Sequence, residues 1–203
     1  MGVSRIVAAG LAGYLIGTFP TADLAVGVAG GRHDLRTEGS GNPGAMNAAS
    51  VLGTGWGLAV LAGDMAKGAV AGVAGRRIGG DPGAYAAAAA SIAGHVAPVW
   101  KRGRGGKGVA TSAGASLAVF PVYFPVDLAV AVAGATRYRQ AERVTRAACA
   151  GWVVAALAAW RFRLPNAWGP EPGPGLPLFA AASSGIVLAA FARGRRQAAE
   201  GAS

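Results

Sequence analysis

The sequence predicts an all-α integral membrane protein with about seven transmembrane helices. Its 203 residues are 53% hydrophobic and only 14% charged, against roughly 25% charged in ordinary soluble domains. Charges are almost absent from three long tracts, residues 6–30, 48–75 and 82–100. The 34 glycines agree with this, because small residues let helices approach each other closely in a bilayer. We therefore expect residues 1–203 to form a single membrane domain.

The expected helices follow the apolar tracts in order, since one crossing needs about 20 mostly apolar residues. The stretch 108–136 is ambiguous because it could cross the membrane once or twice. Pro121 and Pro125 suit a turn between two short crossings. The expected spans are residues 6–28, 50–74, 82–100, 109–120, 122–136, 146–160 and 176–192.

The distribution of Lys and Arg favours two crossings and predicts the orientation. With two crossings, most of these residues gather on one side, whereas with one crossing the bias disappears. Cytoplasmic loops carry an excess of Lys and Arg. We therefore expect a multi-pass protein of the cell (plasma) membrane with its N-terminus outside and its C-terminus in the cytoplasm. Residues 193–203 are expected to form a disordered cytoplasmic tail.

The remaining composition argues against several kinds of partner. The net charge of +10 is compatible with nucleic-acid binding, but basic residues in a membrane chain usually set its orientation, so no nucleic-acid partner is expected. The single cysteine, Cys149, excludes an internal disulfide, and His33 and His95 are the only histidines. We expect no metal and no cofactor, and we expect a monomer surrounded by membrane lipids.

A first polar, glycine-rich stretch, "TEGSGNPGAMN" at residues 37–47, follows the first span. Its side chains offer neutral hydrogen-bonding groups, and its glycines permit tight turns. By itself the stretch favours a flexible connector between helices over a binding loop. The residues that make it a candidate binding loop are Gly39, Ser40, Gly41, Asn42, Gly44 and Asn47.

A second such stretch, "KRGRGGKGVAT" at residues 101–111, is expected on the same side of the membrane. Glycines let backbone N–H groups face an anion, and the N-terminus of a helix beginning near Val109 would add a positive dipole. Lys107 would supply a point charge for phosphate. The alternative is a basic loop that only sets the orientation. The candidate residues are Arg104, Gly105, Gly106, Lys107 and Gly108.

Three ionisable residues lie inside or at the end of apolar tracts. Asp64 and Lys67 are three positions apart and therefore share a helix face, where each is the expected partner of the other. A structural ion pair and a functional one are equally compatible with this spacing. His95, in "GHVAPVW", precedes the second polar stretch by a few residues; it is either a packed hydrogen-bonding residue or a catalyst.

Together, these stretches resemble the bacterial acyl-phosphate:glycerol-3-phosphate acyltransferase family, over roughly residues 13–138. "DLRTEGSGNPGAMNAAS" at 34–50 is similar to the family pattern D-[IV]-R-x-x-G-S-G-N-x-G-A-T-N-x-x-R. Asp64, Lys67 and Gly68 match D-x-x-K-G. "GHVAPVW" and "RGGKGVAT" match G-H-x-x-P-x-[FW] and K-G-G-K-G-V-A-T.

The resemblance implies transfer of a fatty acyl group from acyl phosphate to the 1-hydroxyl of glycerol 3-phosphate, giving lysophosphatidic acid and inorganic phosphate. This is the first acylation of phospholipid biosynthesis, and its active site would face the cytoplasm. The residues expected to be catalytic are Ser40, Asn47, His95 and Lys107. Those expected to bind substrate are Arg36, Gly39, Gly41, Asn42, Gly44, Asp64, Lys67, Arg104, Gly105, Gly106 and Gly108.

The chain departs from the family pattern at two positions of the first stretch. Met46 stands where the pattern has threonine, and Ser50 stands where it has arginine. The C-terminal pattern H-R-x-N-I-x-R-L is replaced by "ARGRRQAAEG". The alternative function is therefore that of a non-catalytic relative that binds acyl phosphate or an anionic lipid.

Overall fold

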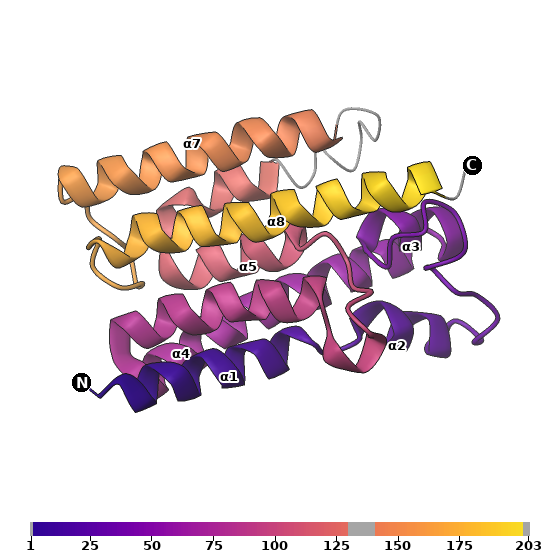
Figure 1. Ribbon diagram of the computed structural model, residues 1–203, viewed down its shortest axis with the longest axis horizontal. Helices are drawn as coiled ribbons and strands as arrows, with labels where there is room; N and C mark the ends of the chain where they lie inside the picture. Colours follow the sequence, from indigo (N-terminus) through magenta and orange to yellow (C-terminus); the bar gives the residue numbers. More distant parts are fainter. Residues whose placement is uncertain (1, 130–140, 201–203) are drawn as a thin grey trace.

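The computed structural model describes residues 2–129 and 141–200, and every regular element in these ranges is a helix (Figure 1). Three segments of the described chain are long and apolar enough to cross a membrane, Val3–Val28, Thr54–Lys101 and Gly175–Arg196. The elements are α1 (Val3–Gly17), α2 (Thr21–Val28), α3 (Ala45–Leu52), α4 (Thr54–Val96), η1 (Val99–Lys101), α5 (Val109–Val119), η2 (Pro121–Tyr123), α7 (Ala141–Arg161) and α8 (Gly175–Glu200).

The first expected span, residues 6–28, is broken into α1 and α2 rather than continuous. Pro20 has no backbone N–H and disfavours helical geometry at Phe19, the residue before it, and α1 ends at Gly17 with Thr18 as its C-cap. The break leaves the carbonyl of Phe19 outside the regular helical ladder. This carbonyl accepts a hydrogen bond from the buried Lys67.

α4 is the central element and turns back on itself. Gly79 and Gly80 leave helical geometry and divide it into two arms, which correspond to the expected spans 50–74 and 82–100. In Figure 1 the arms run side by side between α1 and α5. Because α4 contacts α1, α2, α3, α5 and α8, it positions the other helices of the bundle.

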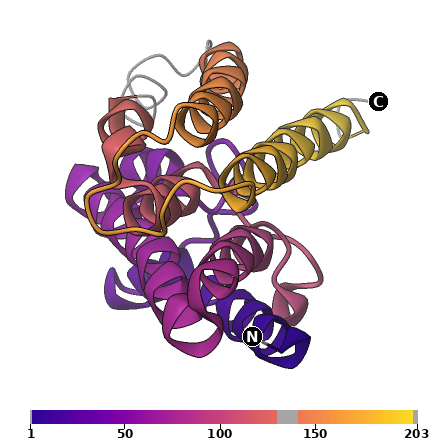
Figure 2. The same ribbon diagram turned by 90° about the vertical axis from the view of Figure 1, so that its left-hand side faces the viewer.

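α7 and α8 form the side of the bundle opposite α1, as Figures 1 and 2 show. The core there is centred on Trp152 of α7, whose ring stacks on Tyr123 with 4.5 Å between ring centroids and meets Phe179 edge-on. Its indole N–H donates to the Ser183 hydroxyl of α8 at 3.2 Å. Aromatic packing and one buried hydrogen bond thus join α7 and α8.

The chain reverses after α5, while the expected two membrane crossings within 108–136 stay a prediction. η2 begins at Pro121, residues 124–129 are helical, and Asp127 returns to line one pocket with Val109 and Ser112 near the start of α5. Residues 130–136 of the expected fifth span lie outside the described residues.

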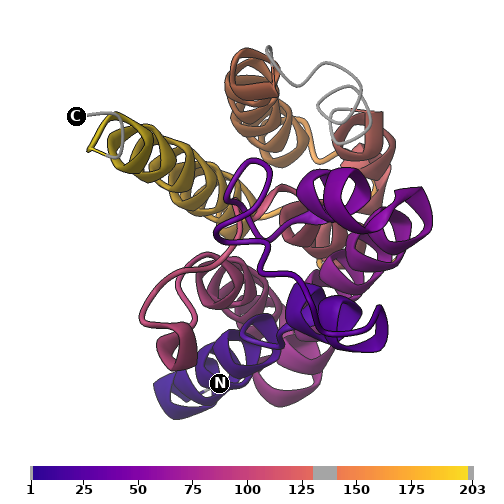
Figure 3. The ribbon, with the colours of Figure 1, turned by 90° about the vertical axis from the view of Figure 1, so that its right-hand side faces the viewer.

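Loops distant in sequence gather at the two ends of the bundle. Figure 3 looks onto the end that carries residues 29–44, residues 97–108 and the end of α8. There Arg193 donates to the carbonyl of Gly103 at 3.2 Å. At the other end Arg76 donates to the carbonyl of Trp168 at 2.7 Å. α8 continues to Glu200, so residues 193–200, expected to be disordered, are helical; this corrects that part of the expectation.

The approach of α4 and α5 generates a stability prediction. A Cβ atom on Gly114 would overlap the backbone carbonyl of Met65, whereas a Cβ on Gly185 of α8 would meet nothing within 4 Å. We expect Gly114→Ala to lower the free energy of unfolding by about 1–3 kcal/mol, the usual range for overpacking. The measurement is thermal unfolding in detergent, with Gly185→Ala as the matched control. Equal melting temperatures for the two variants would contradict the described packing.

Candidate functional site

A crevice opens where the α1–α2 break, both arms of α4 and the residues after α4 meet. The crevice, together with its opening to solvent, contains about 330 Å³ of empty space. Three cations and two carboxylates line it, so the formal charge of the lining is positive by one. The charged and titratable lining residues are Asp23, Arg36, Asp64, Lys67, His95 and Lys101.

Lys67 lies at the inner end of this crevice and is almost completely buried. Its Nζ is 2.8 Å from Asp64 Oδ1, which confirms the expected ion pair one helical turn apart. It also donates to the carbonyl of Phe19 at 3.0 Å and lies 3.1 Å from His95 Nδ1. Thr21 completes the cluster by donating its hydroxyl to Asp64 Oδ1 at 2.6 Å. One cation therefore joins the α1–α2 break to both arms of α4.

The His95 ring links this cluster to the loop of residues 102–108, which we call the glycine loop. The Lys67 ammonium can only donate, so His95 Nδ1 accepts and the ring proton is assigned to Nε2. The Nε2 edge occupies the space where a side chain on Gly106 would lie. The backbone carbonyl of His95 also accepts the N–H of Gly106 at 3.2 Å. His95 therefore supports Gly106 through both its side chain and its backbone.

Arg36 lies at the outer part of the crevice, where Asp23 holds it. The guanidinium donates from two nitrogens to the two oxygens of Asp23, at 2.5 and 3.2 Å. Lys101 lies 3.4 Å from the same carboxylate. Arg36 Nε also donates to the carbonyl of Arg104 at 3.1 Å. The two polar stretches expected to meet at one face are thus joined by a hydrogen bond.

Asn47 is buried, and its amide is used inside its own loop. Its Nδ2 donates to the carbonyls of Leu35 at 2.8 Å and Glu38 at 2.9 Å, and its Oδ1 accepts from the N–H of Ser40 at 2.8 Å. The expected catalytic amide therefore shapes the turn that carries Ser40. Nearby, His33 hydrogen-bonds Glu38 and lowers the pKa of that carboxyl.

Part of the expected first-stretch site does not line the crevice. Arg36 and Pro43 are the residues of this region that do. Ser40 is exposed and is not part of that lining, and Ser50 is exposed with its hydroxyl donating to the carbonyl of Asn47. The other expected residues outside the lining are Gly39, Gly41, Asn42 and Gly44.

The glycine loop has two sides with different chemistry. On the crevice side, the N–H of Gly105 donates to the carbonyl of Val96, and that of Gly106 donates to His95. These two amides were expected to face an anion, but they donate hydrogen bonds to carbonyls of the last turn of α4. The available backbone donors are instead at the start of α5, where Gly108 provides no side-chain cap.

Lys107 lies on this second side, over the ring of Phe191 in α8 at 4.7 Å from the ring centroid. Burial lowers the pKa of its ammonium below the ordinary value, and the negative charge of Glu142 partly opposes this. Within residues 2–129 and 141–200 no carboxylate lies within ion-pair distance of Lys107. A half-buried cation beside a helix N-terminus is suited to binding an anion. Thr111, in the first turn of α5, has a buried hydroxyl with no partner among the described residues.

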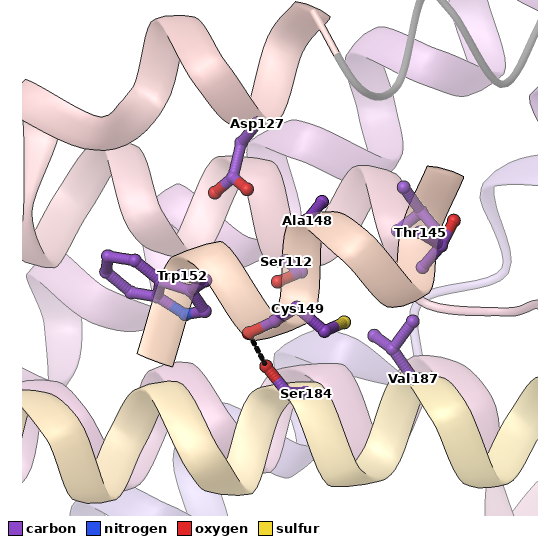
Figure 4. Close-up of a pocket in the computed structure, with 9 residues that line it drawn as sticks. Ser112, Asp127, Thr145, Ala148, Cys149, Trp152, Ser184 and Val187 are labelled. Atoms are coloured by element: carbon purple, nitrogen blue, oxygen red, sulfur yellow. Dashed lines mark hydrogen bonds between the residues drawn. The ribbon is translucent and has the colours of Figure 1, made fainter. Parts of the chain in front are cut away.

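A second pocket lies between α5, residues 124–129, α7 and α8 (Figure 4). Asp127 contributes a carboxylate whose Oδ2 has no hydrogen-bond partner in the described chain. Ser184 donates to the carbonyl of Cys149 across the α7–α8 contact, and Trp152 lies at the same pocket. The pocket places a carboxylate in an apolar region that the sequence interpretation did not single out.

Sequence reasoning also missed several residues of the crevice. Asp23 could have been identified from the sequence, since it is the only charged residue in residues 6–30. No sequence feature indicated Thr21 or the Phe19 carbonyl, because their roles depend on the helix break beside Lys67. Arg193 contacts the glycine loop from a segment expected to be disordered.

Comparisons with known proteins show the family and the fold to which this chain is similar. Residues 7–198 match the family model described as glycerol-3-phosphate acyltransferase. The chain is 47% identical over 130 residues to the glycerol-3-phosphate acyltransferase of Synechococcus elongatus, covering 58% of this chain and 60% of that protein. The corresponding protein of Geobacter sulfurreducens is 37% identical over 147 residues, 71% of this chain and 75% of that protein. The chain thus spans about 60% of the length of the Synechococcus relative.

Two crystal structures of an integral membrane glycerol 3-phosphate acyltransferase have the same fold. One is the glycerol 3-phosphate form and the other the lysophosphatidic acid form, at 24% and 22% identity. Each has a TM-score of 0.71 and covers 97% of this chain and 92% of the other. The chain therefore has an integral membrane fold.

The hydrogen bonds of Asn47 generate a prediction. Asn47→Asp keeps the shape but replaces the donor to two carbonyls by a carboxylate oxygen, so we expect a loss of about 2–3 kcal/mol in the free energy of unfolding. Limited proteolysis of residues 35–47 and thermal unfolding measure it. Asn42→Asp makes the same chemical change in the same loop at an amide outside this hydrogen-bond set. If both variants lose the same stability, Asn47 does not hold the loop.

Proposed function

The chain belongs to the glycerol-3-phosphate acyltransferase family, and we propose that it transfers a fatty acyl group from acyl phosphate to the 1-hydroxyl of glycerol 3-phosphate. The products are lysophosphatidic acid and inorganic phosphate. The observation that carries the proposal is the placement of cations on both sides of the glycine loop. Arg36 and Lys101 lie on one side, and Lys107 lies on the other at the N-terminus of α5.

This placement suits the chemistry of the proposed reaction. The hydroxyl oxygen attacks the acyl carbon, the bond from that carbon to the phosphate oxygen breaks, and the leaving phosphate can take the hydroxyl proton. Both substrates carry phosphate and the reaction expels inorganic phosphate, so fixed positive charge stabilises the charge that develops on the leaving group. Holding two anions close together also replaces a bimolecular encounter by a positioned attack.

We assign one phosphate to Lys107 and the first turn of α5, because these offer a cation without an ion-pair partner in the described chain and open backbone amides. Arg36, Arg104 and Lys101 would attract the second phosphate to the crevice mouth. Ser40 would contact substrate from the exposed turn that Asn47 shapes.

The proposed enzyme is a multi-pass monomer of the plasma membrane with seven crossings. Its N-terminus is outside, and the glycine loop and the C-terminus face the cytoplasm. The positive-inside rule supports this, since Arg36, Arg104 and Arg193 meet at one end of the bundle.

The activity is tested with purified protein in lipid, palmitoyl phosphate and glycerol 3-phosphate, by following phosphate release. We expect turnover by the unaltered protein and a fall in kcat/KM of about 100-fold or more for Lys107→Ala, because a charge-stabilising contact is lost. Arg77→Ala, an exposed cation at the opposite end of the bundle, is the control and should leave kcat/KM unchanged.

A well-folded sample that binds palmitoyl phosphate without turnover would contradict the enzyme and favour the non-catalytic relative. The departures at Met46 and Ser50 are the observations that favour this second function. Ser50→Arg separates the two further, since a large gain in turnover would show that the family's guanidinium is missing here.

The orientation is tested with cysteine labelling in intact cells. In a Cys149→Ser background, Thr37→Cys lies in the loop between α2 and α3, and Gly173→Cys lies between α7 and α8. We expect a membrane-impermeant maleimide to label only Gly173→Cys. Labelling of Thr37→Cys alone would show that the orientation is the opposite of the one proposed.

A further inference from the structure

The Lys67 ammonium has three hydrogens and three acceptors. Asp64 Oδ1, the Phe19 carbonyl and His95 Nδ1 lie within 2.8–3.1 Å of its Nζ. No hydrogen remains for a substrate phosphate. Lys67 was expected to bind substrate, but its geometry fits a residue that acts on other parts of the protein.

His95 is the part of the cluster that reaches the glycine loop. Because its Nδ1 accepts from Lys67, the ring cannot rotate about its axis without losing that hydrogen bond. The opposite edge of the ring then lies against Gly106, and the His95 carbonyl accepts from the same residue. The position of the Lys67 ammonium therefore determines the position of Gly106.

The side-chain hydrogen bonds to the described glycine loop come from the surface. Arg36 donates to the carbonyl of Arg104, and Arg193 donates to that of Gly103; both hydrogen bonds are exposed. Exposed hydrogen bonds compete with water and contribute little rigidity. On the buried side, the His95 ring supports Gly106, the residue that precedes Lys107, beside the backbone hydrogen bonds from Gly105 and Gly106 to the end of α4.

We propose that Lys67 and His95 are positioning residues that fix the glycine loop, and with it Lys107, in the geometry needed for acyl transfer. Asp64 holds the ammonium in place as its ion-pair partner, and Thr21 orients Asp64. The inference rests on the proposed function for its kinetic consequence, whereas its structural consequence at Gly105 and Gly106 is independent of activity.

The kinetic consequence distinguishes positioning from substrate contact. A displaced Lys107 lowers the rate of the chemical step, whereas a lost substrate contact raises KM. A misplacement of about 1 Å can cost about 100-fold in rate. We therefore expect a fall in kcat of about 10-fold or more in variants of the cluster, with KM for glycerol 3-phosphate within about 3-fold of the unaltered protein.

The first variant is His95→Asn. Its amide oxygen can accept from Lys67 as Nδ1 does, so the buried cation keeps its partners, but the edge that supports Gly106 is removed. Ser91→Ala is the matched control, because Ser91 is a buried polar residue one turn earlier on the same arm, and among the described residues its hydroxyl bonds only to the carbonyl of Ala88. It should retain the kcat of the unaltered protein.

The second variant separates a loss of turnover from a loss of folding stability. Lys67→Met alone leaves Asp64 as an unpaired buried carboxylate, a strongly destabilising change. Asp64→Asn combined with Lys67→Met removes both charges, and so it should restore the melting temperature. A purely structural role predicts that turnover returns with stability. Positioning predicts that the double variant is stable while its kcat remains low.

The deciding readout is hydrogen–deuterium exchange of peptides covering residues 103–108, with thermal unfolding as the check on folding. We expect faster exchange there in His95→Asn and in the double variant, but not in Ser91→Ala. Unchanged exchange in a folded His95→Asn, or a raised KM with unchanged kcat, would overturn the proposal. If the unaltered protein shows no turnover, the proposed function fails, and the exchange result alone decides this inference.

Discussion

The structure depends on how one buried cation is satisfied. A charged side chain within an apolar bundle is stable only if every hydrogen finds an acceptor. Lys67 finds a carboxylate on its own helix, a ring nitrogen on the other arm of α4, and the Phe19 carbonyl at the α1–α2 break. Pro20 matters for the same reason, because it ends α1 where that carbonyl is needed. Three segments of the bundle therefore converge on one ammonium group.

The two sides of the glycine loop have different roles: the inner side holds the loop in place, and the outer side presents positive charge. Its inner amides, at Gly105 and Gly106, are bonded to the last turn of α4 and hold the loop. Its outer side leads into the uncapped start of α5 and carries Lys107 over Phe191. A loop fixed on one side can present charge on the other without reorganising when an anion arrives, which is the condition for electrostatic stabilisation of a transition state.

The apolar tracts predicted the all-helical fold and the long arms of α4, because about 20 uncharged residues in a row leave few alternatives, but they did not predict the α1–α2 break or α3. They also predicted the reversal within α4 and the meeting of Arg36 with the glycine loop. The spacing of residues could not predict that the Gly105 and Gly106 amides donate to α4, or that the Asn47 amide donates within its own loop. The acceptors in both cases are backbone carbonyls, which every residue has, so no sequence pattern distinguishes them. Likewise, the extension of α8 to Glu200 follows from helix-forming residues after Gly194 rather than from an apolar pattern.

The most direct test of the account is the protonation of the His95 ring. Replacing His33 by glutamine leaves His95 as the only histidine, so a ¹⁵N-histidine label reports on it alone in an NMR spectrum. The account predicts an unprotonated Nδ1 that accepts from Lys67 and a protonated Nε2. A protonated Nδ1, in the other neutral tautomer or in an imidazolium, could not accept this hydrogen bond and would contradict it.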